Sequence, residues 1–302
     1  MKNKIYDIIV VGVGPAALTA GVYAARYKLD TLLIGMELGG MISGAHKVCN
    51  FPTYSEITGA ELTAKMVEQV KDLGVEIKQE EVLEIKQKKV FEIKTSSGKY
   101  LAKKVIIAKG TEKKKLGAKR EEEFVGKGVS YCATCDAAFY KDKIVGVVGG
   151  SNSALTSALL LTEYVEKVFI FYRQGQFFRA EPAWVSQVEK NSKIEVRFNS
   201  EIEEIYGGEF VEGVKLKDGE SINLDGLFIS VGSLPSEVLS NQLGLRTEAG
   251  YIAVDKMQAT NVPGVFAAGD TTDNPLKQVV TACAEGAIAA NSAFEEIRKE
   301  KV

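Results

Sequence analysis

Short strand-like runs of apolar residues alternate along this chain with amphipathic or alanine-rich stretches. Tyr6 to Val11 predicts a buried strand, Leu18 to Tyr27 predicts a helix, and Thr31 to Ile34 predicts the next strand. Strands that alternate with helices in this way indicate an α/β fold with parallel sheets.

The turn between the first strand and the first helix is rich in small residues. It reads Gly12-Val13-Gly14-Pro15-Ala16-Ala17, which is a G-x-G-x-x-A pattern. Glycines at these positions let the backbone approach a pyrophosphate at the N-terminus of the helix. Because the strand before the turn and the helix after it are both present, the pattern predicts a nucleotide-binding βαβ unit.

A second unit of the same kind follows in the middle of the chain. Lys143 to Val148 predicts a strand, Leu155 to Tyr164 a helix, and Lys167 to Tyr172 the next strand. The turn between the strand and the helix reads Gly149-Gly150-Ser151-Asn152-Ser153-Ala154. Two such units predict two Rossmann-like dinucleotide-binding domains.

The end of the chain carries a third nucleotide feature. A strand from Val265 to Ala268 runs into Gly269-Asp270, and a helix rich in alanine and glycine follows. An aspartate at the carboxyl end of a strand is well placed to hold a ribityl or ribose hydroxyl, although a plain surface turn is the alternative. We expect a first domain formed by residues 1–112 and 241–302, and a second domain, 113–240, inserted into it.

Composition narrows the classes of protein. The net charge is −2, which argues against a nucleic-acid binder that works by bulk electrostatics. The apolar runs are strand-sized, so we expect no membrane span, and we expect no signal peptide before the first strand. Four cysteines in 302 residues are too few for a disulfide scaffold and favour a reducing cytoplasm.

Two of the four cysteines form a C-A-T-C pattern, Cys132 to Cys135. Such a pair can be a redox disulfide, half of a zinc site, or two buried small residues. Structural zinc needs four ligands, and the remaining cysteines and the single histidine are scattered along the chain, so we expect no metal site. A reversible disulfide fits the spacing, and Asp136 is the nearest proton carrier for its chemistry.

Three stretches together resemble the low-molecular-weight thioredoxin reductases. They are "GVGPAALTAGVYAARYKLDTLLIGMELGG", "SYCATCD" and "GVFAAGDTTDNPLKQVVTA", and they follow the family order over essentially the whole chain. The resemblance implies an FAD-dependent enzyme, homodimeric, that passes electrons to the disulfide of thioredoxin or a thioredoxin-like protein.

The resemblance also implies a set of FAD-binding residues in the first domain. These residues are Gly12, Gly14, Pro15, Ala16, Ala17, Met36, Glu37, Gly39, Gly40, Asn50, Gly269, Asp270, Lys277, Gln278 and Val279. Lys277 stands where the family has arginine, Met41 where it has glutamine, and Lys109 where it has threonine or serine. We therefore expect FAD binding with altered flavin contacts.

In this family the second cysteine of the pair, here Cys135, receives electrons from the flavin. Cys132 then attacks the disulfide of the partner, and Asp136 assists protonation. Because the dithiol and the donor site share the inserted domain, the resemblance implies that this domain rotates between two states.

The electron donor is the point at which the chain departs from the family. The implied donor-site residues are Gly149, Ser151, Asn152, Ser153, Arg173 and Arg179. Ser151 replaces a glycine of the turn, and only part of the basic motif that clamps the 2′-phosphate of NADPH is present. NADPH is the leading candidate, and reduced ferredoxin, a deazaflavin or NADH are the alternatives.

Two other functions stay open from the sequence. One is a flavin oxidase or diaphorase, which would need no dithiol. The other is a non-catalytic redox sensor with a degraded dinucleotide site, supported by the departures at Ser151 and Thr156.

Overall fold

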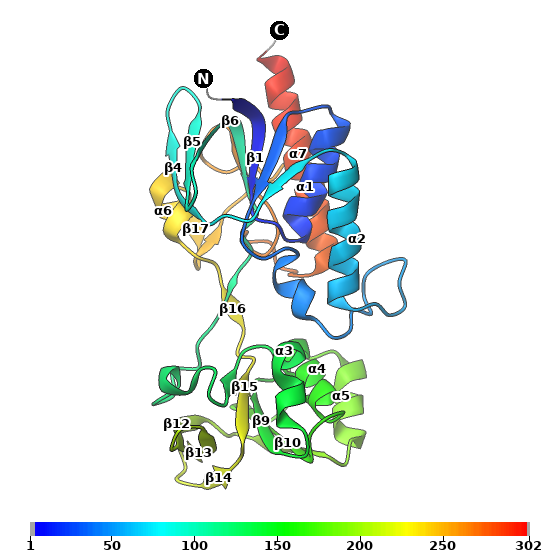
Figure 1. Cartoon of the computed structure of the whole chain (residues 1–302), viewed down its shortest axis with the longest axis vertical. Coiled ribbons are helices and arrows are strands. Elements are labelled where there is room, and N and C mark those ends of the chain that lie inside the picture. Colours follow the sequence, from blue (N-terminus) through cyan, green and yellow to red (C-terminus); the bar gives the residue numbers. More distant parts are fainter. Residues whose placement is uncertain (1–3, 301–302) are drawn as a thin grey trace. The chain divides into compact units, whose positions relative to one another are not determined.

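The computed structural model describes residues 4–300 and divides the chain into two compact units, Lys113–Ser233 and the remainder on either side of it (Figure 1). The inserted unit therefore ends at Ser233, earlier than the expected residue 240. The reason is helix α6 (Val238–Leu243), because its Gln242 side chain donates to the Leu83 carbonyl and accepts the Ile85 N–H of strand β4 (Val82–Gln87) in the first unit.

The first unit is built on a seven-stranded sheet in the order β3-β2-β1-β6-β5-β4, with β19 also pairing with β6. Strands β1, β2, β3, β6 and β19 pair in parallel, whereas β4 and β5 form an antiparallel hairpin against the start of β6. Their bounds are β1 Ile5–Val11, β2 Thr31–Ile34, β3 Glu76–Lys78, β5 Phe91–Thr95, β6 Lys99–Ile107 and β19 Val265–Ala267.

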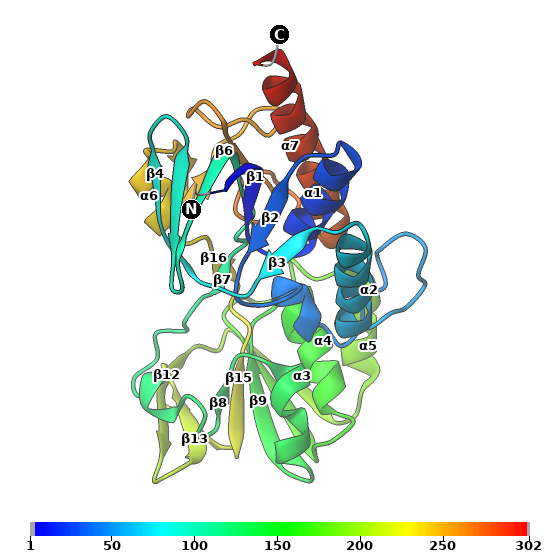
Figure 2. The ribbon, with the colours of Figure 1, turned by 45° about the horizontal axis from the view of Figure 1, so that its top comes forward.

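Three helices lie side by side on one face of this sheet, as Figures 1 and 2 show: α1 (Pro15–Arg26), α2 (Gly59–Asp72) and α7 (Val279–Lys299). Strand β1 is buried on both faces. Ile8 and Val10 pack in the core below the helices, while Ile9 and Val11 pack in a second core that includes Leu239 of α6. A strand buried on both sides reads as a continuous apolar run, which is why it was recognisable in the sequence.

Helix α1 begins at Pro15, inside the glycine turn, and not at Leu18 as expected. Proline suits the first helical position because its φ is preset and its missing N–H is not needed there. In the second unit helix α4 (Asn152–Leu161) likewise begins inside its turn and not at Leu155. In both cases the turn residues form the first helical turn.

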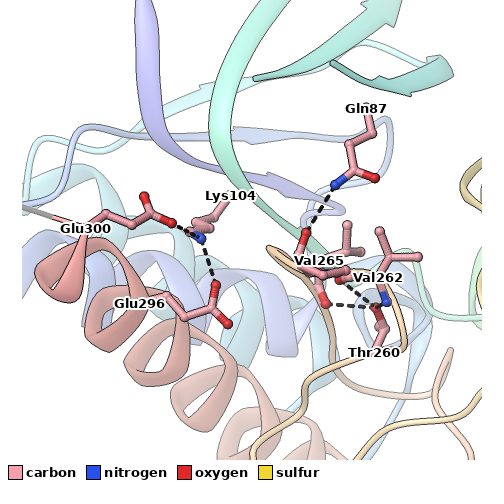
Figure 3. Close-up of polar contacts among 8 residues, drawn as sticks. Gln87, Lys104, Thr260, Val262, Val265, Glu296 and Glu300 are labelled. Carbon is pink, nitrogen blue, oxygen red and sulfur yellow. Dashed lines mark hydrogen bonds and ion pairs between the residues drawn. The ribbon is translucent and has the colours of Figure 1, made fainter. Parts of the chain in front are cut away.

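Strand β19 and helix α7 are tied to the rest of the unit by polar contacts (Figure 3). The ammonium of Lys104, a residue of β6 that is 6% exposed, lies 2.7 Å from Glu296 and 2.6 Å from Glu300 at the end of α7. Before β19, the Thr260 hydroxyl donates to the Val265 carbonyl at 2.9 Å. These contacts hold the C-terminal end of α7 against β6 and the residues before β19 against its first residue.

The second unit holds a five-stranded parallel sheet in the order β11-β10-β9-β15-β8. Helices α4 and α5 (Pro182–Lys190) pack with this sheet in one hydrophobic core. A three-stranded antiparallel sheet packs with it in a second hydrophobic core. The bounds are β8 Val129–Ser130, β9 Ile144–Val148, β10 Lys167–Tyr172, β11 Ile194–Phe198, β12 Ile202–Gly207, β13 Val211–Leu216, β14 Ser221–Asn223 and β15 Gly226–Ile229.

Short elements complete the chain. They are the 3₁₀ helices η1 Gly40–Gly44, η2 Glu122–Phe124 and η3 Ala137–Tyr140, the helix α3 Ala133–Asp136, and the paired strands β7 Glu112–Lys113 with β16 Ser233–Leu234 and β17 Thr247–Glu248 with β18 Tyr251–Ile252. Among residues 4–300, no helix has both the length and the apolar character needed to cross a membrane.

Candidate functional site

The first glycine turn, between β1 and α1, is shaped for close approach to the backbone. Gly12 has φ of 126°, and a Cβ placed there would lie 2.1 Å from the Ala108 carbonyl oxygen. Gly14 is the N-cap of α1 and has no side chain to satisfy the first N–H groups of the helix. The free N–H groups and the positive end of the helix dipole make this turn an anion site of the kind that holds a pyrophosphate.

The segment after β2 is fastened to this turn. Gly39, at φ of 85°, donates its N–H to the Val13 carbonyl at 2.8 Å, and Gly40 donates to the Glu37 carbonyl at 2.9 Å. The carbonyl of Met36 accepts the Gln79 amide at 3.2 Å. Glu37 is exposed near the end of the second strand, where dinucleotide-binding folds carry the acid that binds ribose.

The end of β19 and the start of α7 lie against the same turn. A Cβ on Gly269 would be 3.0 Å from the Cβ of Ala16, and one on Gly286 would be 2.0 Å from the Ala16 carbonyl. Small residues on α7 therefore let the helix pack onto the turn at Ala16. Gly269, the residue before Asp270, thereby lies close to Ala16 of the glycine turn, far from it in sequence.

Four predicted polar residues interact as two pairs, Asp270 with Lys277 and Asn50 with Gln278. Burial raises the pKa of the Asp270 carboxyl, and the charge of Lys277 opposes the rise. Burial lowers the pKa of Lys277, whose ammonium donates to the Thr272 carbonyl. The Asn50 amide donates to the Gln278 side chain at 3.0 Å, and Val279 begins α7 next to it.

One acid was missed by the sequence reasoning. Glu285 of α7 is 7% exposed, and its Oε2 accepts the Gly269 N–H at 2.7 Å. The sequence did contain a signal, because an acid lies within a helix that is rich in alanine and glycine. A carboxylate buried in such a helix is costly unless it has hydrogen-bonding partners.

The cysteine pair lies in the second unit. Cys132 and Cys135 form a disulfide, and Cys132 is the N-cap of α3. The Cys135 N–H donates to the Cys132 sulfur at 3.2 Å, and the Cys132 N–H donates to the Ser130 hydroxyl at 3.0 Å. A donor on the Cys132 sulfur favours its thiolate once the disulfide is reduced.

Residues on either side of the pair make further polar interactions. Asp136 ends α3, and its N–H donates to the Cys132 carbonyl at 3.2 Å. Burial, with help from the charge of Asp136, raises the pKa of Tyr140. On the other side the Tyr131 hydroxyl donates at 2.5 Å to Glu121, a 3% exposed carboxylate that the sequence reasoning did not single out.

The second glycine turn, between β9 and α4, has the same tight construction. Gly149 has φ of 141°, and a Cβ there would lie 2.3 Å from the Ser230 carbonyl. A Cβ on Gly150 would lie 2.4 Å from the ring of Tyr172. Ser151 is the N-cap of α4 with extended backbone, φ −103° and ψ 174°, so serine is accommodated there without strain. Ser153 lies in the first turn of α4.

The loop after β10 folds back onto this turn. Arg179 forms an isolated bridge with Ser151. The Asn152 amide donates to the Glu181 carboxylate at 2.8 Å, and its carbonyl accepts the Glu181 N–H at 2.7 Å. Asn152 is thus engaged in holding the loop. Within residues 4–300, neither Arg173 nor Arg179 forms an ion pair, and both are exposed.

The predicted residues therefore gather in two groups, one in each unit. In the part of the chain that the structure describes, no cluster of three or more His, Cys, Asp or Glu side chains could hold a metal ion.

Comparisons with known proteins agree with this geometry. The family described as "Pyridine nucleotide-disulphide oxidoreductase" matches residues 6–286. The thioredoxin reductase of Listeria monocytogenes is 41% identical over 308 aligned residues, covering 99% of this chain and 96% of the relative.

Two solved structures are also similar to the chain. The thioredoxin reductase of Lactococcus lactis, in its FR conformation, is 36% identical with a TM-score of 0.94, covering 97% of this chain and 99% of that one. A ferredoxin-flavin thioredoxin reductase of Clostridium acetobutylicum is 35% identical with a TM-score of 0.54, covering 97% and 98%. The chain belongs to the low-molecular-weight thioredoxin reductases, enzymes of the pyridine nucleotide-disulphide oxidoreductase family with a redox-active C-x-x-C disulfide.

Proposed function

We propose that the enzyme transfers electrons from NADPH through FAD to the Cys132–Cys135 pair and on to the disulfide of thioredoxin or a thioredoxin-like protein. The observation that carries the proposal is the combination of two tight glycine turns, one in each unit, with a disulfide on the inserted unit. Four cysteines in 302 residues support a reducing cytoplasm as its location, and family resemblance supports a homodimer.

The first unit fits FAD. Gly12 and Gly14 would open the backbone of the turn to the pyrophosphate, Glu37 after the second strand would bind the adenosine ribose, and Asp270 after β19 would hold the ribityl hydroxyls. Lys277 brings a positive charge to the site, which favours an anionic reduced flavin. Bound FAD supplies the two-electron carrier between the donor and the disulfide.

The dithiol step balances with two electrons and two protons. The Cys132 thiolate attacks one sulfur of the thioredoxin disulfide, and the other thioredoxin sulfur leaves and takes a proton. The Cys135 thiolate then attacks the Cys132 sulfur, which restores the disulfide and releases the second thioredoxin thiol. The Cys135 N–H on the Cys132 sulfur supports Cys132 as the attacking thiolate, and Asp136 is the proton carrier beside the pair.

The inserted unit carries both the disulfide and the donor turn, so we propose that it rotates to present them to the flavin in turn. The two connections at residues 112–113 and 233–234 are where such a rotation would occur.

The donor site supports NADPH through its two arginines. β9 and β10 are neighbouring parallel strands, so Arg173 at the end of β10 lies at the same edge of the sheet as the second glycine turn. Arg179 returns to that turn through its bridge with Ser151. Exposed guanidinium groups that form no ion pair within residues 4–300 suit the 2′-phosphate that distinguishes NADPH from NADH.

Replacing Arg179 tests this assignment. We expect Arg179→Ala to raise the KM for NADPH by about 10- to 100-fold, the equivalent of one charge-assisted hydrogen bond, and to leave the KM for NADH unchanged. Initial rates of flavin-dependent turnover with each nucleotide measure it. Arg197→Ala is the control, because Arg197 is already paired with Glu195.

Reduced ferredoxin is the second candidate donor. It is favoured by Ser151 at a glycine position of the turn and by the similarity to a ferredoxin-flavin thioredoxin reductase. If ferredoxin reduces the flavin and neither NADPH nor NADH does so, the NADPH assignment is wrong and the arginines have another role.

We propose that an exposed aromatic side chain beside the dithiol helix contacts thioredoxin. Phe139, in η3 immediately after the dithiol helix, is 76% exposed. We expect Phe139→Ala to raise the KM for thioredoxin by about 10-fold or more, since a buried phenylalanine contributes roughly 1.5–3 kcal/mol. Flavin reduction by the donor should not change.

Phe210→Ala is the control, because it removes a 58% exposed phenylalanine between β12 and β13. It should leave both the KM for thioredoxin and the rate of flavin reduction unaltered. An unchanged KM in Phe139→Ala would remove this residue from the interface.

A further inference from the structure

Glu285 is the buried acid of α7 that the proposed chemistry leaves without a role. Its Oε2 accepts the Gly269 N–H at 2.7 Å and lies 3.3 Å from the hydroxyl of Thr272, a residue with no exposed surface. Both partners belong to the turn that follows β19. The carboxylate thus reaches from the helix into the turn that carries Asp270.

This turn depends on a partner for its first N–H. Gly269 has φ of 78°, and its carbonyl accepts both the N–H and the hydroxyl of Thr272 at 2.9 Å. The Gly269 N–H is buried and can only donate, so it needs an acceptor from outside the turn. Glu285 supplies that acceptor, and it thereby fixes the backbone of the turn that carries Asp270.

Glu285 also belongs to a group of charges around Lys277. Burial lowers the pKa of Lys277, while the charges of Asp270, Glu285 and Asp273 act in the opposite direction. Burial raises the pKa of Glu285, and the Gly269 N–H, the side chains of Asn274 and Thr272 and the charge of Lys277 oppose this rise. The Gly269 N–H donates to Oε2 at 2.7 Å and so favours the ionised form of the carboxyl, whose charge acts on Lys277 against the effect of burial.

We propose that Glu285 is a positioning residue of the flavin site, which holds the Asp270 turn in place and keeps the flavin midpoint potential low by partly neutralising Lys277. The inference rests on the proposed binding of FAD by the first unit. An uncompensated cation beside the flavin would stabilise its anionic reduced form, so removal of the Glu285 charge should shift the potential in the positive direction.

The test compares Glu285→Gln with Glu285→Ala and with the charge control Glu295→Gln. Glu295 lies on the same helix in a surface pair with Arg298. The midpoint potential is measured by anaerobic dye equilibration of the holoenzyme, and the dissociation constant of oxidised FAD by titration of the apoprotein. Both readouts are independent of turnover.

In Glu285→Gln the amide oxygen still accepts the Gly269 N–H, but the negative charge is gone. We expect its preference for reduced over oxidised FAD to be about 10-fold greater than in the wild type, which raises the midpoint potential by about 30 mV for two electrons. Glu285→Ala should in addition weaken oxidised FAD by about 10-fold or more, because the turn loses its acceptor. Glu295→Gln should match the wild type in both measurements.

Unchanged potential and affinity in Glu285→Gln and Glu285→Ala would overturn the inference while leaving the FAD assignment intact. If the glutamine variant does not fold, Glu285→Asp keeps the charge but shortens the reach. It should then retain the wild-type potential with weaker FAD binding, and a shifted potential would contradict the charge argument. A wild-type protein that does not bind FAD would instead overturn the proposed function itself.

Discussion

A Cys135→Ser variant is expected to lose thioredoxin reduction by at least about 10³-fold while its flavin is still reduced by the electron donor. A single thiol at Cys132 can attack the partner disulfide, but it has no second sulfur with which to resolve the mixed disulfide. The electrons then stop at the flavin. Parallel assays of thioredoxin reduction and of flavin bleaching separate the two steps.

Cys49→Ser is the matched control for this variant, because Cys49 is an exposed free cysteine outside the pair. It should retain full activity. Wild-type thioredoxin reduction by Cys135→Ser would show that the disulfide is not on the electron path, and the flavin oxidase or diaphorase alternative would then take its place.

Gly12→Ala is expected to lower the free energy of unfolding by about 4 kcal/mol or more and to yield protein without bound flavin. The new Cβ would lie 2.1 Å from the Ala108 carbonyl oxygen, and the residue would have to keep φ of 126°. The contact is with backbone at the end of β6, which cannot move aside without disturbing the sheet. Denaturant unfolding and flavin absorbance of the purified protein measure the two effects.

Gly74→Ala provides the comparison at a glycine where only the backbone angle matters. Gly74 has φ of 76°, and a Cβ there has no atom within 4 Å. Gly74→Ala should lower the free energy of unfolding by only about 1–2 kcal/mol and leave the flavin content unchanged. Equal effects of the two substitutions would mean that the turn at Gly12 is looser than the structure indicates.

The parts of the fold that could be predicted are those in which a short-range pattern reports a local structure. Thr31–Ile34 and Lys167–Tyr172 have the expected strand bounds because a strand buried on both faces must be apolar throughout. The starts of α1 and α4 were expected too late, because Pro15 and Asn152 belong both to a turn and to a first helical turn. Apolar periodicity cannot reveal a helix that begins in polar or small residues.

The candidate site shows the same division. The glycine turns and the cysteine pair were recognisable because each is a compact motif whose chemistry lies within a few residues. The link from Glu285 to Gly269 and the link from Asn152 to Glu181 join segments that are separate in the sequence. The end of the inserted unit was misplaced for a related reason, since the position of α6 depends on its contacts with β4.

The most direct test of the electron path is an anaerobic stopped-flow experiment in which the flavin of the purified enzyme is first reduced and then mixed with oxidised thioredoxin. If electrons pass from FAD through Cys132 and Cys135, the absorbance of oxidised flavin returns in the wild type after mixing. One thioredoxin thiol then appears for each electron that the flavin loses. In Cys135→Ser the flavin absorbance does not return. Flavin that stays reduced in the presence of thioredoxin, but is reoxidised at once by oxygen or a quinone, would contradict the account.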